Sequence, residues 1–322
     1  MKEALYSLIA LSLVGLAVEV FSRETTESNF SLMSKADKQV VEGKIEKAID
    51  LYEQCLNKKE GETAEEKQLS HEYCLIHKAR ALFKDKRLEE ALELYDTLPK
   101  SSYLWPVTLV EKAWIFYKKG DYNRTLGLLA TYKSPLLQSY FIPEVEVLNA
   151  LVYFRLCLWD DSFSIVQDYE AEESKAKELK AWIANKGYKT IDLNTVASFD
   201  ALPYGRTLWL QLLHRPWVKT EKEKREILAK LASFLVSEVE RASQDLFSIS
   251  LELYTKKKSL IYKKEKLISD RYRGDLSNVH RKVDQYFWDF RGEFFADELG
   301  DYSFGLKSNC ETVRKGGSYE SQ

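Results

Sequence analysis

The residue types that could do chemistry in this chain are few and scattered. The four histidines, His71, His77, His214 and His280, form no His-Glu-x-x-His pair and have no nucleophile at a suitable spacing. Neither a metal-ligand set nor a phosphate-binding loop can be identified. We therefore expect no catalytic residues, no cofactor and no bound metal.

An acidic and aromatic run between positions 284 and 301 supports the main alternative. Its carboxylates, such as Glu293 and Asp297, could form an acid–base pair or a metal site. No histidine accompanies them, and a metal-ligand spacing is not evident. We favour a structural role in which segment 286–310 docks onto the rest of the chain. An enzyme or a metal-binding protein remains the alternative.

The four cysteines contain no Cys-x-x-Cys pair, which argues against zinc binding and redox chemistry. In an exported chain they allow two disulfides with three connectivities, and free, buried cysteines are an equally good interpretation. If a disulfide forms, we favour Cys55–Cys74. It would close the charged loop between them and stabilise the fold by about 3 kcal/mol on a chain-entropy estimate. The other two cysteines are Cys157 and Cys310.

The N-terminus has the features of an export signal. Lys2 precedes a short apolar run, Leu8–Val14, and small residues at possible cleavage positions follow it. We interpret residues 1–22 as a signal peptide and expect a periplasmic protein. The alternative is an uncleaved signal anchor in the inner membrane, because Leu5–Phe21 is nearly long enough to span a bilayer. No cysteine follows the run, so we expect no lipid anchor.

Composition indicates a helical, folded protein. The chain has 322 residues, of which 45% are hydrophobic and 30% charged, and it contains only 13 glycines and 6 prolines. This balance favours long helices with solvated faces over strands and tight turns. The formal net charge of -2 gives no general reason to expect nucleic acid as a partner. We assign the chain to the all-α class.

A repeat of about 34 residues organises the first half of the chain. Small residues recur in pairs twelve positions apart, separated by a helix break: Ala36 and Ala48, Ala79 and Ala91, Ala113 and Thr125, Ala150 and Ser162. Small side chains let two antiparallel helices approach closely, and one such pair cannot bury its apolar face alone. The pattern therefore predicts stacked helical hairpins, the first of them weaker and separated from the second by a charged insertion.

These residues resemble the tetratricopeptide repeat over positions 31–170. The third unit is the clearest match: Leu109, Ala113, Phe116, Gly120, Asp121, Tyr122, Thr125 and Leu129. The resemblance implies a right-handed α-solenoid with a concave groove lined by the first helix of each unit. Arg80, Trp114 and Leu151 replace the asparagines that clamp a terminal carboxylate in chaperone-binding members, so a chaperone adaptor is disfavoured.

Carried over by register, the resemblance gives an aromatic groove with a basic rim that suits a peptide or a partner helix. Its partner-binding residues would be Tyr73, Arg80, Phe83, Trp114, Tyr117, Lys118, Phe154 and Arg155, with Ile76, Val110, Val147 and Leu151 also in the lining. The alternative is that several of these side chains pack against the C-terminal helices.

Residues 171–285 are expected to form long C-terminal helices. An apolar helix is expected over Phe199–Leu213, with a start or kink at Pro203 and Gly205. Beyond Pro216 the apolar steps mostly alternate three and four, as in a heptad seam. The seam consists of Leu228, Leu231, Leu235, Val239, Ala242, Leu246, Ile249, Leu253, Leu260 and Leu267. Its lysine-rich far half could contact acidic lipid or nucleic acid, but we favour a solvated face.

The ending of the chain resembles a narrower group. The run from Trp288 to Tyr302, followed by Ser308-Asn309-Cys310, is similar to the ending of exported tetratricopeptide proteins of myxobacteria and predatory deltaproteobacteria. Some members of that group are associated with gliding-motility machinery. Phe294-Phe295 depart conservatively from that pattern. Residues 311–322 are expected to be a disordered tail.

The sequence thus predicts a non-catalytic protein–protein interaction scaffold in the bacterial cell envelope, with another envelope protein or peptide as its partner. The second alternative, beside an enzyme, is a cytoplasmic adaptor whose basic helix contacts nucleic acid. That alternative requires residues 1–22 to have been misread as an export signal.

The repeat register makes one direct prediction. Replacing Ala113 by leucine inserts three carbon atoms at a helix crossing, and we expect the overpacking to lower the free energy of unfolding by about 1–3 kcal/mol. Thermal or chemical denaturation measures the change. Unchanged stability would show that the register of the third repeat is wrong.

Overall fold

The computed structural model describes residues 28–58, 63–193, 196–215, 218–262, 278–281, 287–289 and 293–310. The expected signal (1–22) and the expected tail (311–322) lie outside these ranges. The chain divides into two compact units, one built from Met1–Thr108 and Trp182–Phe234, the other from Leu109–Ala181 and Leu235–Gln322. Each unit therefore combines early and late parts of the chain.

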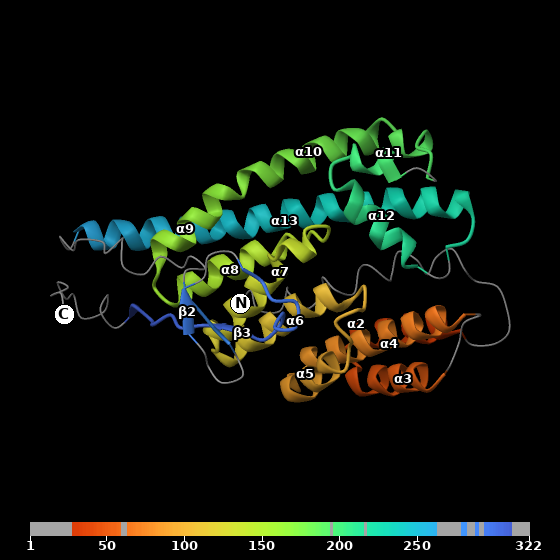
Figure 1. Ribbon diagram of the computed structural model, residues 1–322, viewed down its shortest axis with the longest axis horizontal. Coiled ribbons are helices and arrows are strands. Elements are labelled where there is room, and N and C mark those ends of the chain that lie inside the picture. Colours follow the sequence, from red (N-terminus) through yellow and green to blue (C-terminus); the bar gives the residue numbers. More distant parts are fainter. Residues whose placement is uncertain are drawn as a thin grey trace. The chain divides into compact units, whose positions relative to one another are not determined.

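Helices make up most of the described residues, which confirms the expectation of a mostly helical chain (Figure 1). The first unit holds α2 (Asn29–Val41), α3 (Ile45–Asn57), α4 (Ala64–Lys84), α5 (Leu88–Asp96), η3 (Gly187–Lys189), α11 (Val196–Asp200) and α12 (Gly205–Leu213). The second holds α7 (Tyr122–Tyr132), η2 (Pro135–Leu137), α8 (Glu144–Arg155) and α9 (Trp159–Asp168). The division falls inside α6 (Trp105–Lys119), α10 (Glu170–Ala184) and α13 (Glu221–Tyr262).

Four helical hairpins share the same turn. In each, the residue seven positions after the first small residue has positive φ: Gly43 at 77°, Lys86 at 67°, Gly120 at 80° and Cys157 at 60°. The amide of the residue that follows donates to the carbonyl five residues back, at 2.8–2.9 Å in all four turns. This left-handed cap satisfies the free carbonyls at a helix end and sends the chain back along the same side.

The paired small residues meet where the helices of each hairpin cross. All eight side chains, Ala36, Ala48, Ala79, Ala91, Ala113, Thr125, Ala150 and Ser162, are 0% exposed. In the third hairpin the Thr125 hydroxyl donates to the carbonyl of Ala113 at 3.3 Å. In the fourth, Ser162 donates to the carbonyl of Ala150 at 2.9 Å. These hydrogen bonds place the paired small residues beside each other in the third and fourth hairpins, as the register predicts.

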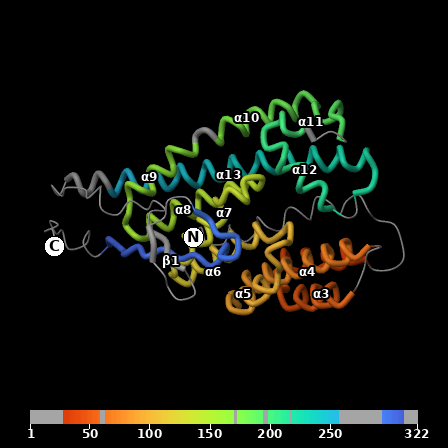
Figure 2. The backbone as a smooth tube through the Cα atoms, in the orientation of Figure 1, coloured from red at the N-terminus to blue at the C-terminus, as the bar shows by residue number. Residues whose placement is uncertain are grey.

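The predicted apolar helix over Phe199–Leu213 is two helices, α11 and α12, and the chain reverses between them (Figure 2). Tyr204 has a left-handed backbone with φ at 57°. A Cβ on Gly205 would overlap the carbonyl of Phe199, so only glycine fits at that position. The break falls at the Pro203–Gly205 signal.

The predicted C-terminal seam lies on one continuous helix, α13. Its first eight members, from Leu228 to Leu253, are all buried. A capping box begins the helix, in which Thr220 and Glu223 exchange backbone-to-side-chain hydrogen bonds at 2.9 and 3.2 Å. The Leu260 side chain and Leu267 lie outside the described parts of the chain.

A small antiparallel sheet near the C-terminus was not predicted. Strands β1 (Asn278–Arg281), β2 (Phe287–Asp289) and β3 (Tyr302–Phe304) pair in the order β2-β1-β3. Strand β3 lies against α7, whose residues 125–132 are all buried. A helix that is buried on every side needs a second cover besides its hairpin partner, and β3 provides it for α7.

Hydrogen bonds from side chains of α7 and a disulfide hold the C-terminal segment in place. The Thr131 hydroxyl accepts from the amide of Gly300 at 3.1 Å. The Asn123 side chain donates to the carbonyl of Leu306 at 3.0 Å and accepts from its amide at 2.9 Å. Two disulfides, Cys55–Cys74 and Cys157–Cys310, use all four cysteines. The favoured Cys55–Cys74 pairing is confirmed, and the second disulfide ties the segment to the turn between α8 and α9.

Gly127 in the middle of α7 tests this packing. An alanine there would ordinarily stabilise a helix by up to about 1 kcal/mol. Here its Cβ would overlap the carbonyl group of Tyr302. We expect Gly127→Ala to lower the free energy of unfolding by about 1–3 kcal/mol and to speed amide hydrogen exchange in Tyr302–Phe304. A more stable variant with unchanged exchange would contradict the contact.

Candidate interaction surfaces and a buried carboxylate cluster

The predicted partner-binding residues of the first unit stand on α4. Tyr73, Arg80 and Phe83 are half-buried, so part of each side chain remains on the surface. Ile76, which lies between them in register, is buried. Three of these four positions therefore remain accessible in part.

The predicted residues of the second unit separate into an open group and a buried one. Lys118 and Arg155 are exposed, and Tyr117 and Phe154 are half-buried. Arg155 donates from Nε to the Tyr117 hydroxyl at 3.0 Å, which joins the ends of α8 and α6. Trp114 is only 8% exposed.

Trp114, one of the predicted partner-binding residues, is packed inside the second unit. Its indole nitrogen is buried and lies near Glu144, whose carboxyl interacts with Glu238 and Arg241 of α13. Val110 and Val147, from the same predicted lining, are also buried. Part of the surface expected to receive a partner is thus closed by side chains of the chain's own helices. This agrees with the alternative that the lining packs against the C-terminal helices.

Glu144 and Glu238 form the centre of a carboxylate cluster in the second unit. Burial raises the pKa of Glu144 to about 8, and the nearby charges of Glu238 and Glu111 add to the rise, while Arg241 and Trp114 oppose it. Burial also raises the pKa of Glu238 to about 7, against the opposing effect of Arg241. Both carboxyls therefore retain protons at pH values where an exposed glutamate is ionised.

Arg241 and Tyr169 complete this cluster. Arg241 forms an ion pair with Glu238 one turn away on α13, where the Glu238 side chain is only 11% exposed. The Tyr169 hydroxyl is buried, and no hydrogen-bond partner for it lies among the residues described. Burial and the surrounding carboxylates raise the pKa of Tyr169. One guanidinium therefore faces two carboxyls, and the second carboxyl is most stable with its proton attached.

The cluster lies between helices of the second unit. It joins the start of α8 to α13, and the Lys180–Glu240 ion pair at 3.1 Å joins α10 to α13 nearby. Because burial raises the pKa of both glutamates, the folded chain holds protons on them that the unfolded chain releases near neutral pH.

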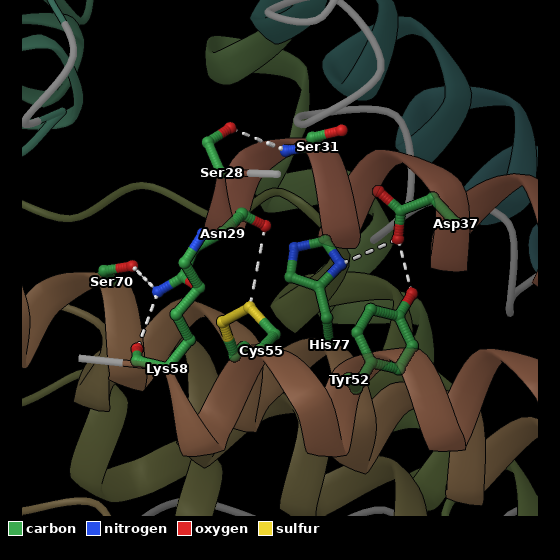
Figure 3. The surroundings of a disulfide bond; sticks show 10 residues. Ser28, Asn29, Ser31, Asp37, Tyr52, Cys55, Lys58, Ser70 and His77 are labelled. Atoms are coloured by element: carbon green, nitrogen blue, oxygen red, sulfur yellow. Dashed lines mark hydrogen bonds and ion pairs between the residues drawn. A yellow bond between two sulfur atoms is a disulfide. The ribbon is translucent and has the colours of Figure 1, made fainter. Parts of the chain in front are cut away.

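The first unit contains a separate buried network beside the Cys55–Cys74 disulfide (Figure 3). Asp37 Oδ1 accepts from the Tyr52 hydroxyl at 2.5 Å and lies 3.1 Å from His77 Nδ1. His77 Nε2 lies 3.5 Å from a guanidinium nitrogen of Arg80. Because an arginine can only donate, Nε2 must accept and Nδ1 must carry the proton. Arg80 is therefore anchored internally while part of it stays on the surface.

The histidines described in the first unit have different surroundings. His71 is exposed, and His77 belongs to the buried network. His214 stacks on Tyr103 with ring centroids 4.0 Å apart, and burial lowers its pKa. His280 is in β1. Among the described residues, no group of three or more His, Cys, Asp or Glu is placed to hold a metal ion.

Of the acidic and aromatic run of the main alternative, the structure describes strand β2 (Phe287–Asp289) and the residues from Glu293 onwards. Glu293 and Asp297 are exposed. The amide of Phe295 donates to the Tyr302 hydroxyl at 3.1 Å, and the ring of Phe294 lies 6.1 Å from that of Tyr302. This part of the run is a turn folded around a buried tyrosine. Within the described ranges, no helix combines the length and hydrophobicity that a membrane span needs.

The sequence interpretation missed the carboxylate cluster. The only local signal was the pair Glu238 and Arg241, three positions apart and beside the seam residues Val239 and Ala242. Glu144, the first residue of α8, resembles an ordinary acid at a helix N-terminus. The two glutamates lie far apart in sequence, so only the fold shows that they interact.

Comparisons with known proteins identify no relative: no family model, no curated protein and no solved structure matches the chain.

The cluster predicts a specific pH dependence. Because the pKa values of Glu144 and Glu238 are higher in the folded chain than in the unfolded one, the folded state binds more protons between about pH 5 and pH 8. Its free energy of unfolding must therefore fall as the pH rises through this window. We expect Glu144→Gln, a neutral isostere of the protonated acid, to reduce that fall by about 1–3 kcal/mol.

Guanidinium denaturation at a series of pH values, with the disulfides intact, measures the effect. Glu252→Gln is the matched control, because Glu252 is exposed on the same α13 helix. Equal pH slopes for wild type and Glu144→Gln would contradict the assignment.

Proposed function

We propose that the chain is a non-catalytic protein-interaction scaffold of the tetratricopeptide type, which binds a peptide or helix of another envelope protein. The observation that carries the proposal is the repetition of one hairpin geometry four times. Each hairpin places a residue with positive φ seven positions after a buried small residue and a second buried small residue five positions later. Repeated hairpins of this kind typically serve as extended binding surfaces.

Two surfaces supply the chemistry for binding, one in each unit. The first consists of Tyr73, Arg80 and Phe83 on α4, and we call it the α4 surface. Half-buried aromatic rings give contact area at low entropic cost, and an internally anchored arginine is preorganised to meet a carboxylate. An extended segment with apolar and acidic side chains fits this combination.

The second surface lies at the ends of α6 and α8 and is called the α6–α8 surface. It consists of Tyr117, Lys118, Phe154 and Arg155. The hydrogen bond from Arg155 to Tyr117 sets the orientation of both side chains. Trp114 is not part of it, because that side chain is packed inside the unit. The surface has the same character as the α4 surface, with aromatic rings beside basic groups.

The cysteines support a location outside the cytoplasm. Disulfides persist in oxidising compartments, and both disulfides of this chain close onto packed helices or their turns. The apolar run at Leu8–Val14 and the resemblance to exported proteins point the same way. We propose the periplasm, with either a cleaved signal or a retained anchor.

Site-specific photocrosslinking in cells that make the chain tests the proposal. A benzophenone amino acid is placed at Phe83 or at Tyr117, one on each surface. Matched controls carry it at exposed positions elsewhere in the same unit, Lys47 on α3 and Glu178 on α10. We expect a discrete protein adduct from at least one surface position and none from the controls.

Charge-reversal variants then test whether the arginines contribute to capture. Arg80→Glu and Arg155→Glu should each reduce capture at their own surface, because they reverse the charge offered to an acidic segment. Adducts at the control positions alone, or at none of the four positions, would overturn the proposal.

A further inference from the structure

The two disulfides of the chain differ in how easily a reductant can reach them. Cys55 and Cys74 are both 0% exposed and belong to the apolar core formed by α2, α3 and α4. Cys157 and Cys310 are only half-buried. Thiol–disulfide exchange requires a thiolate to approach one of the sulfurs directly, so an accessible disulfide is reduced faster than an enclosed one. The Cys157–Cys310 disulfide is therefore the one open to exchange.

The residues that this disulfide holds, 305–310, attach to the second unit at its surface. None of these residues is fully buried. Leu306 forms two hydrogen bonds with the side chain of Asn123, at 2.9 Å through its amide and at 3.0 Å through its carbonyl. The amide of Asn309 donates to the carbonyl of Leu156 at 2.8 Å. Hydrogen bonds at a surface compete with water and contribute little net stability, so the disulfide is the strongest attachment of this segment.

The strand that precedes this segment is anchored in another way. Tyr302 and Phe304 of β3 are buried, and β3 pairs with β1. The amide of Gly300 donates to the Thr131 hydroxyl of α7 at 3.1 Å. Burial of two aromatic side chains outweighs a few hydrogen bonds at the surface. We therefore expect β3 to stay in place without the disulfide, whereas residues 305–310 depend on it.

We propose that the Cys157–Cys310 disulfide is a reducible latch. A dithiol reductant opens it, residues 305–310 leave the turn between α8 and α9, and the rest of the second unit keeps its fold. Because Cys310 Sγ lies 3.2 Å from the carbonyl oxygen of Arg155, opening the latch changes the edge of the α6–α8 surface. The latch itself does not depend on what that surface binds.

The exchange proceeds in two steps. One thiolate of the dithiol attacks a sulfur of the Cys157–Cys310 disulfide, which forms a mixed disulfide and releases the other cysteine as a thiolate that takes up a proton. The second thiol of the reductant then loses its proton and attacks the reductant's own bound sulfur. This step closes a disulfide in the reductant and releases the second cysteine, which is protonated in turn. The chain gains two electrons and two protons, and the dithiol is oxidised to a disulfide.

Disulfide mapping of the purified, folded full chain tests whether the reduction is selective. The chain is treated with dithiothreitol for a series of times, new thiols are blocked with N-ethylmaleimide, and the labelled peptides are quantified by mass spectrometry. We expect Cys157 and Cys310 to be labelled at least about tenfold faster than Cys55 and Cys74, because the core must open before a reductant reaches the latter pair. Equal rates, or faster labelling of Cys55 and Cys74, would overturn the proposal.

Hydrogen exchange tests whether the segment is released. Oxidised wild type is compared with wild type reduced only at the latch and with the double variant Cys157→Ser/Cys310→Ser, which has no sulfur at either position. We expect the amides of residues 305–310 to exchange about tenfold faster in both open forms, with unchanged protection in β3 and α7. The reduced wild type separates the opening of the disulfide from any effect of the serines on folding.

Two results of the exchange experiment on reduced wild type would contradict the latch. The first is unchanged exchange in residues 305–310, which would show that other contacts hold the segment. The second is a loss of protection throughout β3 and α7, which would make the disulfide a requirement of the fold.

Discussion

The close approach of two helices within each hairpin is the constraint on which the rest of the structure depends. Helices can cross at such short range only where both carry small side chains, and the eight fully buried residues at the crossings meet that condition. The left-handed turn residue must then return the chain at a fixed angle, seven positions after the first small residue. A lysine and a cysteine accept this conformation in two of the four turns, at a cost that glycine avoids in the others. The turn geometry is thus kept even where the residue type does not favour it.

Features governed by local spacing could be predicted from the sequence. The hairpins, the α13 seam and the Cys55–Cys74 disulfide each follow from residues close together in the chain. Strand β3 could not be predicted, because its cover for α7 depends on contacts such as Thr131–Gly300, separated by 169 residues. The burial of Trp114 and the proximity of Glu144 to Glu238 could not be predicted either, because they too depend on contacts between residues far apart in the chain. A helix pattern shows which face is apolar and does not show which element covers it.

The burial of Glu144 and Glu238 carries a free-energy cost. Placing two carboxyls and one guanidinium in a packed interior removes hydration that a single ion pair does not fully replace. A proton on one of the two carboxyls near neutral pH lowers this cost, because a neutral carboxyl loses less hydration on burial than a charged one. An apolar pair at these positions would pack without any pH dependence. The glutamates therefore make the attachment of α13 to its own unit sensitive to protons, in a way that a leucine seam alone would not be.

The polar side chains of helix α13 find their hydrogen-bond or ion-pair partners in two different ways. Toward the hairpins of the second unit it presents Glu238 and Arg241, whose charges need specific partners and so fix a single arrangement. In contrast, Ser248, Ser250 and Thr255 donate hydrogen bonds to carbonyl groups of the same helix and need no partner from another element. Helix α13 thus combines charged groups that need partners from other helices with hydroxyls that need none, and only the former make its packing depend on specific residues.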